Sequence, residues 1–83
     1  MTAKQARELS EQYLREDREY VDDRIREACG RGRYRVWIQD INLANAAATK
    51  EYYRSVGFEV KERKGGSVKE FLISWEIEEA QPE

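Results

Sequence analysis

The pattern of apolar positions begins with one long amphipathic helix. Thr2 and Gln5 have the spacing of a capping box, and no glycine or proline follows until Gly30. A helix of roughly 27 residues would be about 40 Å long, which exceeds what a small domain covers. We therefore predict that its N-terminal half meets another surface, in a homo-oligomer. Apolar side chains recur at spacings of three, four and seven, at Ala6, Leu9, Tyr13, Tyr20, Val21, Ile25 and Ala28.

The candidate residues for the oligomer interface are Leu9, Tyr13 and Tyr20, which share one stripe of this helix. Two tyrosines one heptad apart are typical of a core or of a seam between helices.

After Gly30 and Gly32 the spacing of the apolar residues changes from the helical period to alternation at every second residue. The segment "YRVWIQ" (34–39) places Tyr34, Val36 and Ile38 on one face and Arg35, Trp37 and Gln39 on the other, which predicts a strand with one buried face. A second helix is expected to begin near Asn42 or Asn45 and to end at Val56, because Gly57 and Phe58 resemble a left-handed cap with its apolar follow-on.

The last part of the chain predicts a β-hairpin. "FEVKERK" and "SVKEFLISWEI" flank Gly65 and Gly66, which tolerate the positive φ angles of a tight turn. Phe71, Ile73, Trp75 and Ile77 fall on one face of the final strand, so we place this strand in the centre of the sheet.

The predicted fold class is α+β, in the order α-β-α-β-β. A long N-terminal helix and a short helix cover one side of a small three-stranded sheet, mixed or antiparallel. Residues 1–78 form the single domain, and residues 79–83 are expected to be a frayed acidic tail.

The composition excludes several kinds of chemistry. There is no histidine, which removes histidine triads and imidazole catalysis, and Cys29 alone forms neither an intramolecular disulfide nor a structural zinc site. Cys29 is expected to be a buried, inert thiol. We expect a cytoplasmic protein with no membrane association, catalytic residue or cofactor. The pairs Glu16-Asp17 and Asp22-Asp23 diverge on a helix, so we interpret them as partners of nearby arginines and expect no metal site.

The net charge of −2 conceals a segregation along the chain. Residues 31–75 carry nine basic and five acidic side chains, an excess of +4. Arginine binds phosphate in a planar, bidentate manner, and the start of the second helix would add backbone donors. The alternative is a solvated sheet edge whose cations discourage unwanted strand pairing. The candidate ligand-binding residues are Arg31, Arg33, Arg35, Trp37, Tyr52, Arg63, Lys64 and Lys69.

Trp37 is the most informative single side chain, because the alternation places it opposite the apolar face of its strand. It either stacks a base or fills a partner's pocket, or it closes the second face of the sheet, and the sequence leaves these interpretations open. Tyr52 and Tyr53 point about 100° apart on a helix, so one is expected to be buried and the other exposed.

Part of the chain resembles the acyl-CoA-dependent N-acetyltransferase superfamily. Asn45, Ala48, Tyr53 and the Gly57-Phe58 pair approximate the Asn-x-x-Ala, tyrosine and Gly-Phe of that superfamily. However, the tyrosine comes one residue late, and no strand and Gly-rich loop precede the long helix to hold a pyrophosphate. We therefore expect no acetyl transfer and no enzyme.

More of the chain resembles a class of small phage and prophage proteins. The shared features are a capped N-terminal helix beginning "TAKQARELSEQYL", "GFEV" and a closing "LISW". This resemblance implies a binding protein that antagonises a host defence, either by sequestering an anionic nucleotide signal or by blocking a host protein.

The alternative function is a winged-helix-like regulator that binds nucleic acid. Its second helix would enter the groove of DNA, and "VKERKGGSVKE" would form the wing.

Overall fold

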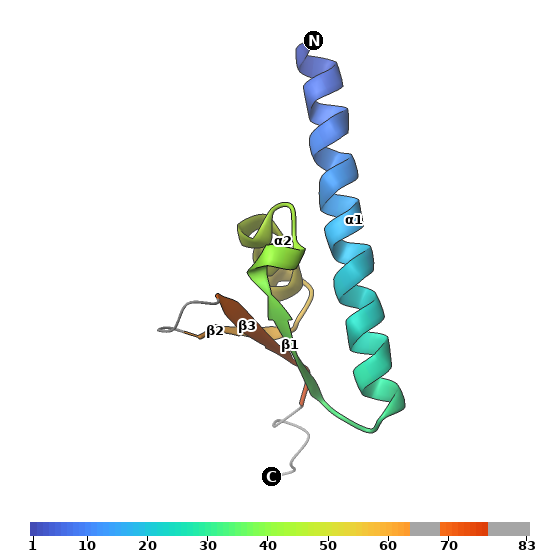
Figure 1. Cartoon of the computed structure of the whole chain (residues 1–83), viewed down its shortest axis with the longest axis vertical. Helices are drawn as coiled ribbons and strands as arrows, with labels where there is room; N and C mark the ends of the chain where they lie inside the picture. Colours follow the sequence, from blue (N-terminus) through green and yellow to red (C-terminus); the bar gives the residue numbers. More distant parts are fainter. Residues whose placement is uncertain (64–68, 77–83) are drawn as a thin grey trace.

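The computed structural model describes residues 1–63 and 69–76, and it confirms the predicted α+β order (Figure 1). Lys64, the Gly65-Gly66 turn, Ile77 and the tail 79–83 lie outside the described residues. The elements are α1 (Ala3–Gly30), β1 (Arg35–Gln39), the 3₁₀ helix η1 (Asp40–Asn42), α2 (Ala46–Ser55), β2 (Glu59–Glu62) and β3 (Glu70–Ser74).

The sheet has the order β1-β3-β2, so the last strand is central, as predicted. Both pairings are antiparallel, with Trp37 opposite Leu72 in one and Lys61 opposite Leu72 in the other. The two edge strands are therefore β1 and β2.

The core lies between the helices and one face of the sheet. Val21 of α1 and Tyr53 of α2 are fully buried, together with inward-facing residues of all three strands. Each such side chain contributes about 1.5–3 kcal/mol when it leaves water. The strand residues of this core are Ile38, Val60, Phe71 and Ile73. Within residues 1–63 and 69–76, no helix covers the other face of the sheet (Figure 1).

Both helices end in the way that the glycine positions predicted. The backbone φ angles of Gly32 and Gly57 are 75° and 104°, in the left-handed region that favours glycine. The following residues, Arg33 and Phe58, donate their backbone N–H groups back to carbonyl groups of the last helical turns, at 2.9 and 3.0 Å. Thr2 and Gln5 form the predicted capping box at the start of α1.

Cys29 corrects one expectation. It is exposed, because the last turn of α1 directs its neighbour Ala28 towards the protein interior instead.

The N-terminal part of α1 projects beyond the rest of the chain (Figure 1). Residues 3–13 are all exposed, and the molecule is 54 Å long but only 23 Å thick. Of the predicted interface residues, Leu9 is 40% and Tyr13 47% exposed, whereas Tyr20 packs against the core. In the part of the chain that the structure describes, no helix is long and apolar enough to cross a membrane.

Candidate functional site

A groove of about 730 Å³ runs between the C-terminal turns of α1 and strand β1. Its helical wall and its strand wall both carry arginines. The lining residues are Arg24, Glu27, Ala28 and Arg31 of α1, followed by Arg33, Tyr34, Arg35, Val36, Trp37 and Glu76.

The charge of this arginine groove is unbalanced. Four arginines face two glutamates, and Glu27 is engaged by Arg31 at 3.2 Å. Within residues 1–63 and 69–76, no carboxylate lies within ion-pair distance of Arg33 or Arg35. A guanidinium group offers five N–H donors and no acceptor, so these side chains suit the binding of an anion.

Trp37 lies where the groove meets the open face of the sheet. It is 46% exposed, on the face away from the helices, as the alternation predicted. The guanidinium carbon of Arg63 lies 5.9 Å from the centre of the indole ring, and Arg63 also pairs with Glu70 at 2.6 Å. Arg63 therefore supports Trp37 from across β3 and does not line the groove itself.

The structure does not bring the rest of the predicted set to this place. Tyr52 contacts Arg18, 4.8 Å from its ring centre, and lines a separate cavity of about 110 Å³ between α1 and α2. Lys69 is exposed at the start of β3, where its carbonyl group accepts a hydrogen bond from the Asp40 backbone at 3.0 Å. Of the predicted ligand-binding residues, the groove thus gathers Arg31, Arg33, Arg35 and Trp37.

Side chains of the chain itself engage several backbone donors around the start of α2, which was expected to add donors for a ligand. The carboxylate of Asp17 accepts hydrogen bonds from the backbone N–H groups of Ala44 and Asn45, at 2.8 and 2.7 Å, and from the Thr49 hydroxyl at 3.0 Å. Asn45 also caps α2 by accepting from the Ala48 N–H. A carboxylate of the chain itself therefore lies at the positive end of this helix.

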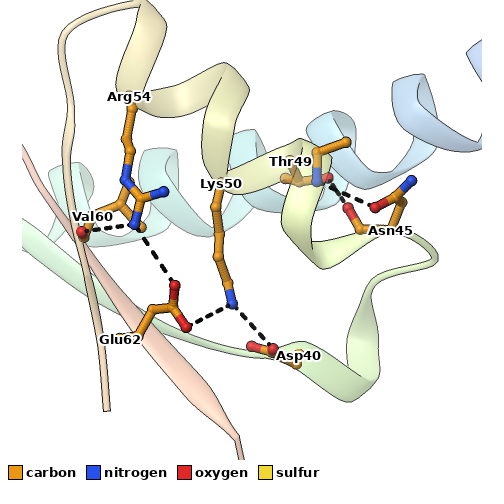
Figure 2. A network of polar contacts seen from close by, with 8 residues as sticks. Asp40, Asn45, Thr49, Lys50, Arg54, Val60 and Glu62 are labelled. Carbon is orange, nitrogen blue, oxygen red and sulfur yellow. Dashed lines mark hydrogen bonds and ion pairs between the residues drawn. The ribbon is translucent and has the colours of Figure 1, made fainter. Parts of the chain in front are cut away.

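A second polar network joins η1, α2 and β2 (Figure 2). Lys50 is 8% exposed and pairs with Asp40 at 3.2 Å and Glu62 at 3.5 Å. Arg54 donates to the Val60 carbonyl at 3.4 Å and lies 3.8 Å from Glu62. Because these charges neutralise one another, this network holds the elements together and leaves no free cation for a ligand among them.

Tyr53 completes the attachment of α2 to α1. Its hydroxyl donates to Asp22 at 2.5 Å and lies 3.0 Å from the Arg18 carbonyl. Burial, and then the adjacent Asp22 carboxylate, raise the pKa of Tyr53 well above its usual value. Asp17 is thus a buried and Asp22 a half-buried hydrogen-bond acceptor, whereas the sequence indicated surface partners of arginine.

Sequence reasoning missed Arg24, Glu27 and Glu76 in the groove. Arg24 and Arg31 are seven residues apart, a spacing that places both on one side of a helix. Asp17 had a signal too, because it lies four residues before the buried Val21 and so interrupts the apolar stripe.

Comparison of the chain with protein-family models, with curated proteins and with solved structures gave no match. The chemistry of the groove is therefore inferred from its own residues.

Proposed function

We propose that this protein is a non-enzymatic binding protein whose arginine groove holds an anionic ligand. The observation that carries the proposal is the excess of arginine over carboxylate in the groove, with three guanidinium groups that no described carboxylate engages, those of Arg24, Arg33 and Arg35. The mode of action is stoichiometric, by depletion or occlusion of the ligand.

The chemistry of the groove suits an anion with several acceptor oxygens. Guanidinium groups bind phosphate or carboxylate through two parallel hydrogen bonds. Trp37 adds an exposed aromatic face beside them, on which a flat group of the ligand stacks. Sequestration of an anionic nucleotide signal and occlusion of a host protein are both compatible with such a groove, and both stay predictions.

Nucleic-acid binding through α2 is the weaker alternative. Thr49, Lys50 and Tyr53 of this ten-residue helix are buried. Asp17 and Asn45 already accept the N–H groups of Ala44, Asn45 and Ala48 around its start. A recognition helix needs an exposed face with base-reading side chains near its N-terminus, and this part of α2 is engaged within the chain.

The test is calorimetric titration with inorganic pyrophosphate at low salt. We compare Arg33→Ala/Arg35→Ala with a matched control, Arg7→Ala/Arg15→Ala, which removes the same charge from the exposed N-terminal half of α1. The groove variant is expected to lose affinity about tenfold or more, and the control less than about threefold. Equal losses in both variants would reduce the interaction to general charge, and absence of pyrophosphate binding to the unaltered protein would refute the proposal.

The proposed oligomer has a separate test. Native mass spectrometry of the full chain and of Leu9→Glu/Tyr13→Glu reports the number of subunits, and an oligomer through α1 requires that only the variant be monomeric.

A further inference from the structure

The outer edge of β1 presents backbone hydrogen-bonding groups along the arginine groove. Trp75 donates its N–H to the Tyr34 carbonyl at 2.9 Å, and Asp40 donates to the Lys69 carbonyl at 3.0 Å. Residues of an antiparallel pair alternate between bonding the partner strand and facing away. Between these two ends of the ladder, Val36 and Ile38 therefore bond β3, and the N–H and C=O groups of the intervening residues point outwards.

The outward-facing residues are Arg35, Trp37 and Gln39, and the first two line the groove. Among residues 1–63 and 69–76, no hydrogen bond reaches the backbone groups of Arg35 or Trp37 from outside the sheet. The edge of β2 is partly occupied, because Arg54 donates to the outward carbonyl group of Val60. The unpaired edge of β1 in the described sheet thus coincides with the unbalanced arginines.

We propose that the groove binds an extended acidic peptide segment of a partner protein, which adds to β1 as a further strand of the sheet. This inference rests on the proposed function and specifies its ligand. The peptide's backbone would bond the outward groups of Arg35 and Trp37, and the C-terminal turns of α1 would form the opposite wall. Peptides that add to a sheet edge gain affinity from the backbone and specificity from alternate side chains.

Charge complementarity determines the composition of the segment. Side chains of an added strand alternate between its two faces. Those on the open face meet Arg35 and Trp37, and those on the helical face meet Arg24 and Arg31. Acidic residues are therefore accepted on both faces.

A second copy of this chain is a poorer occupant of the groove. Pairing of two β1 edges would bring the arginines of both copies together, and like charges on adjacent strands destabilise the pairing. A small anion leaves the outward backbone groups unused.

The test compares two substitutions of Arg35, which distinguish the contribution of its backbone N–H group from that of its side-chain charge. Arg35→Ala removes the guanidinium group alone, whereas Arg35→Pro also removes the outward N–H. Because that N–H makes no bond to β3, proline is tolerated there as it is on other edge strands. The probes are inorganic pyrophosphate and a fluorescein-labelled peptide of glutamate and valine of about seven residues, a typical strand length. A second peptide carries methyl groups on alternate backbone nitrogens, which blocks one bonding edge and keeps the charge.

Strand addition predicts that Arg35→Pro weakens peptide binding about tenfold more than Arg35→Ala does, and that the two variants bind pyrophosphate equally. On the unaltered protein, the methylated peptide is expected to bind at least about tenfold more weakly than the unmodified peptide. If both variants and both peptides bind alike while pyrophosphate still binds, strand addition is wrong and the groove is a simple anion site. If pyrophosphate also fails to bind, the proposed function fails with it.

Two further outcomes are decisive. Dimerisation that Arg35→Pro abolishes and Arg35→Ala preserves would overturn the proposal in favour of a second copy. If circular dichroism shows that Arg35→Pro is unfolded, the comparison of the methylated and unmodified peptides on the unaltered protein decides alone.

Discussion

Asp17 is the residue whose removal tests most directly how α2 is held in place. Its side chain is 4% exposed and accepts two backbone N–H groups at the start of α2 and one hydroxyl group. Asp17→Ala leaves the Ala44 and Asn45 N–H groups and the Thr49 hydroxyl without this acceptor. Thr49 keeps its bond to the Asn45 carbonyl at 2.8 Å, so the loss is concentrated on the two backbone donors.

The magnitude follows from these contacts. A hydrogen bond to a charged group contributes about 1.5–3 kcal/mol, so two such bonds contribute about 3–6 kcal/mol. The donors are only partly buried, and water replaces part of the loss, which brings the expected cost of Asp17→Ala to about 3–4 kcal/mol. A domain of this size has a free energy of unfolding of only about 4–12 kcal/mol. The variant is therefore expected to lose about a quarter or more of its free energy of unfolding.

Urea unfolding followed by circular dichroism measures this cost. Asp23→Ala is the matched control, because Asp23 is an exposed carboxylate on the same helix that pairs only with the exposed Arg26. The control is expected to cost less than about 1 kcal/mol. If Asp17→Ala costs no more than Asp23→Ala at an unchanged m-value, the proposed attachment of α2 through Asp17 is wrong.

Three other predictions follow from named contacts. Because the pKa of Tyr53 is raised in the folded protein, its contribution to the free energy of unfolding is fully present below the unfolded tyrosine pKa near 10 and falls as the pH rises above that value. Tyr53→Phe should therefore show a smaller decrease of the urea unfolding midpoint at alkaline pH than the unaltered protein does. Lys50→Ala leaves Asp40 without its buried partner and should cost about 2–4 kcal/mol in urea unfolding, more than Lys50→Arg does. Trp37→Ala should cost under about 1.5 kcal/mol, because half of the ring is already in water, yet should weaken binding in the groove.

The fold followed from the sequence because its signals are local. The capping box at Thr2, the glycines after each helix and the alternation along β1 each fix one boundary through backbone chemistry. The central position of the last strand followed from the length of its apolar face. Exposure of Cys29 did not follow, because a one-residue step at a helix end rotates the side chain by about 100°.

The candidate site was predictable only in part, because it depends on which elements lie side by side. Arg33, Arg35 and Trp37 are close in sequence, so their proximity was evident, whereas Arg24 joins them through the packing of α1 along β1. Tyr52 was separated from them by the direction of α2. The role of Asp17 required knowing that the start of α2 lies against the middle of α1, 27 residues away.

The positions of the unpaired charges show whether the cations along a strand edge only prevent strand pairing or can also bind a ligand. Cations that only deter strand pairing have no reason to gather on an opposing helix as well. Here Arg24 and Arg31 of α1 line the same groove as Arg33 and Arg35. The positive charge therefore lies on both walls of the arginine groove and not only along the edge of β1. Around α2, in contrast, Lys50 and the helix N-terminus are neutralised by carboxylates of the chain itself. Excess positive charge and unpaired backbone groups therefore coincide at β1. An acidic peptide that adds to the sheet as a strand requires both of these features.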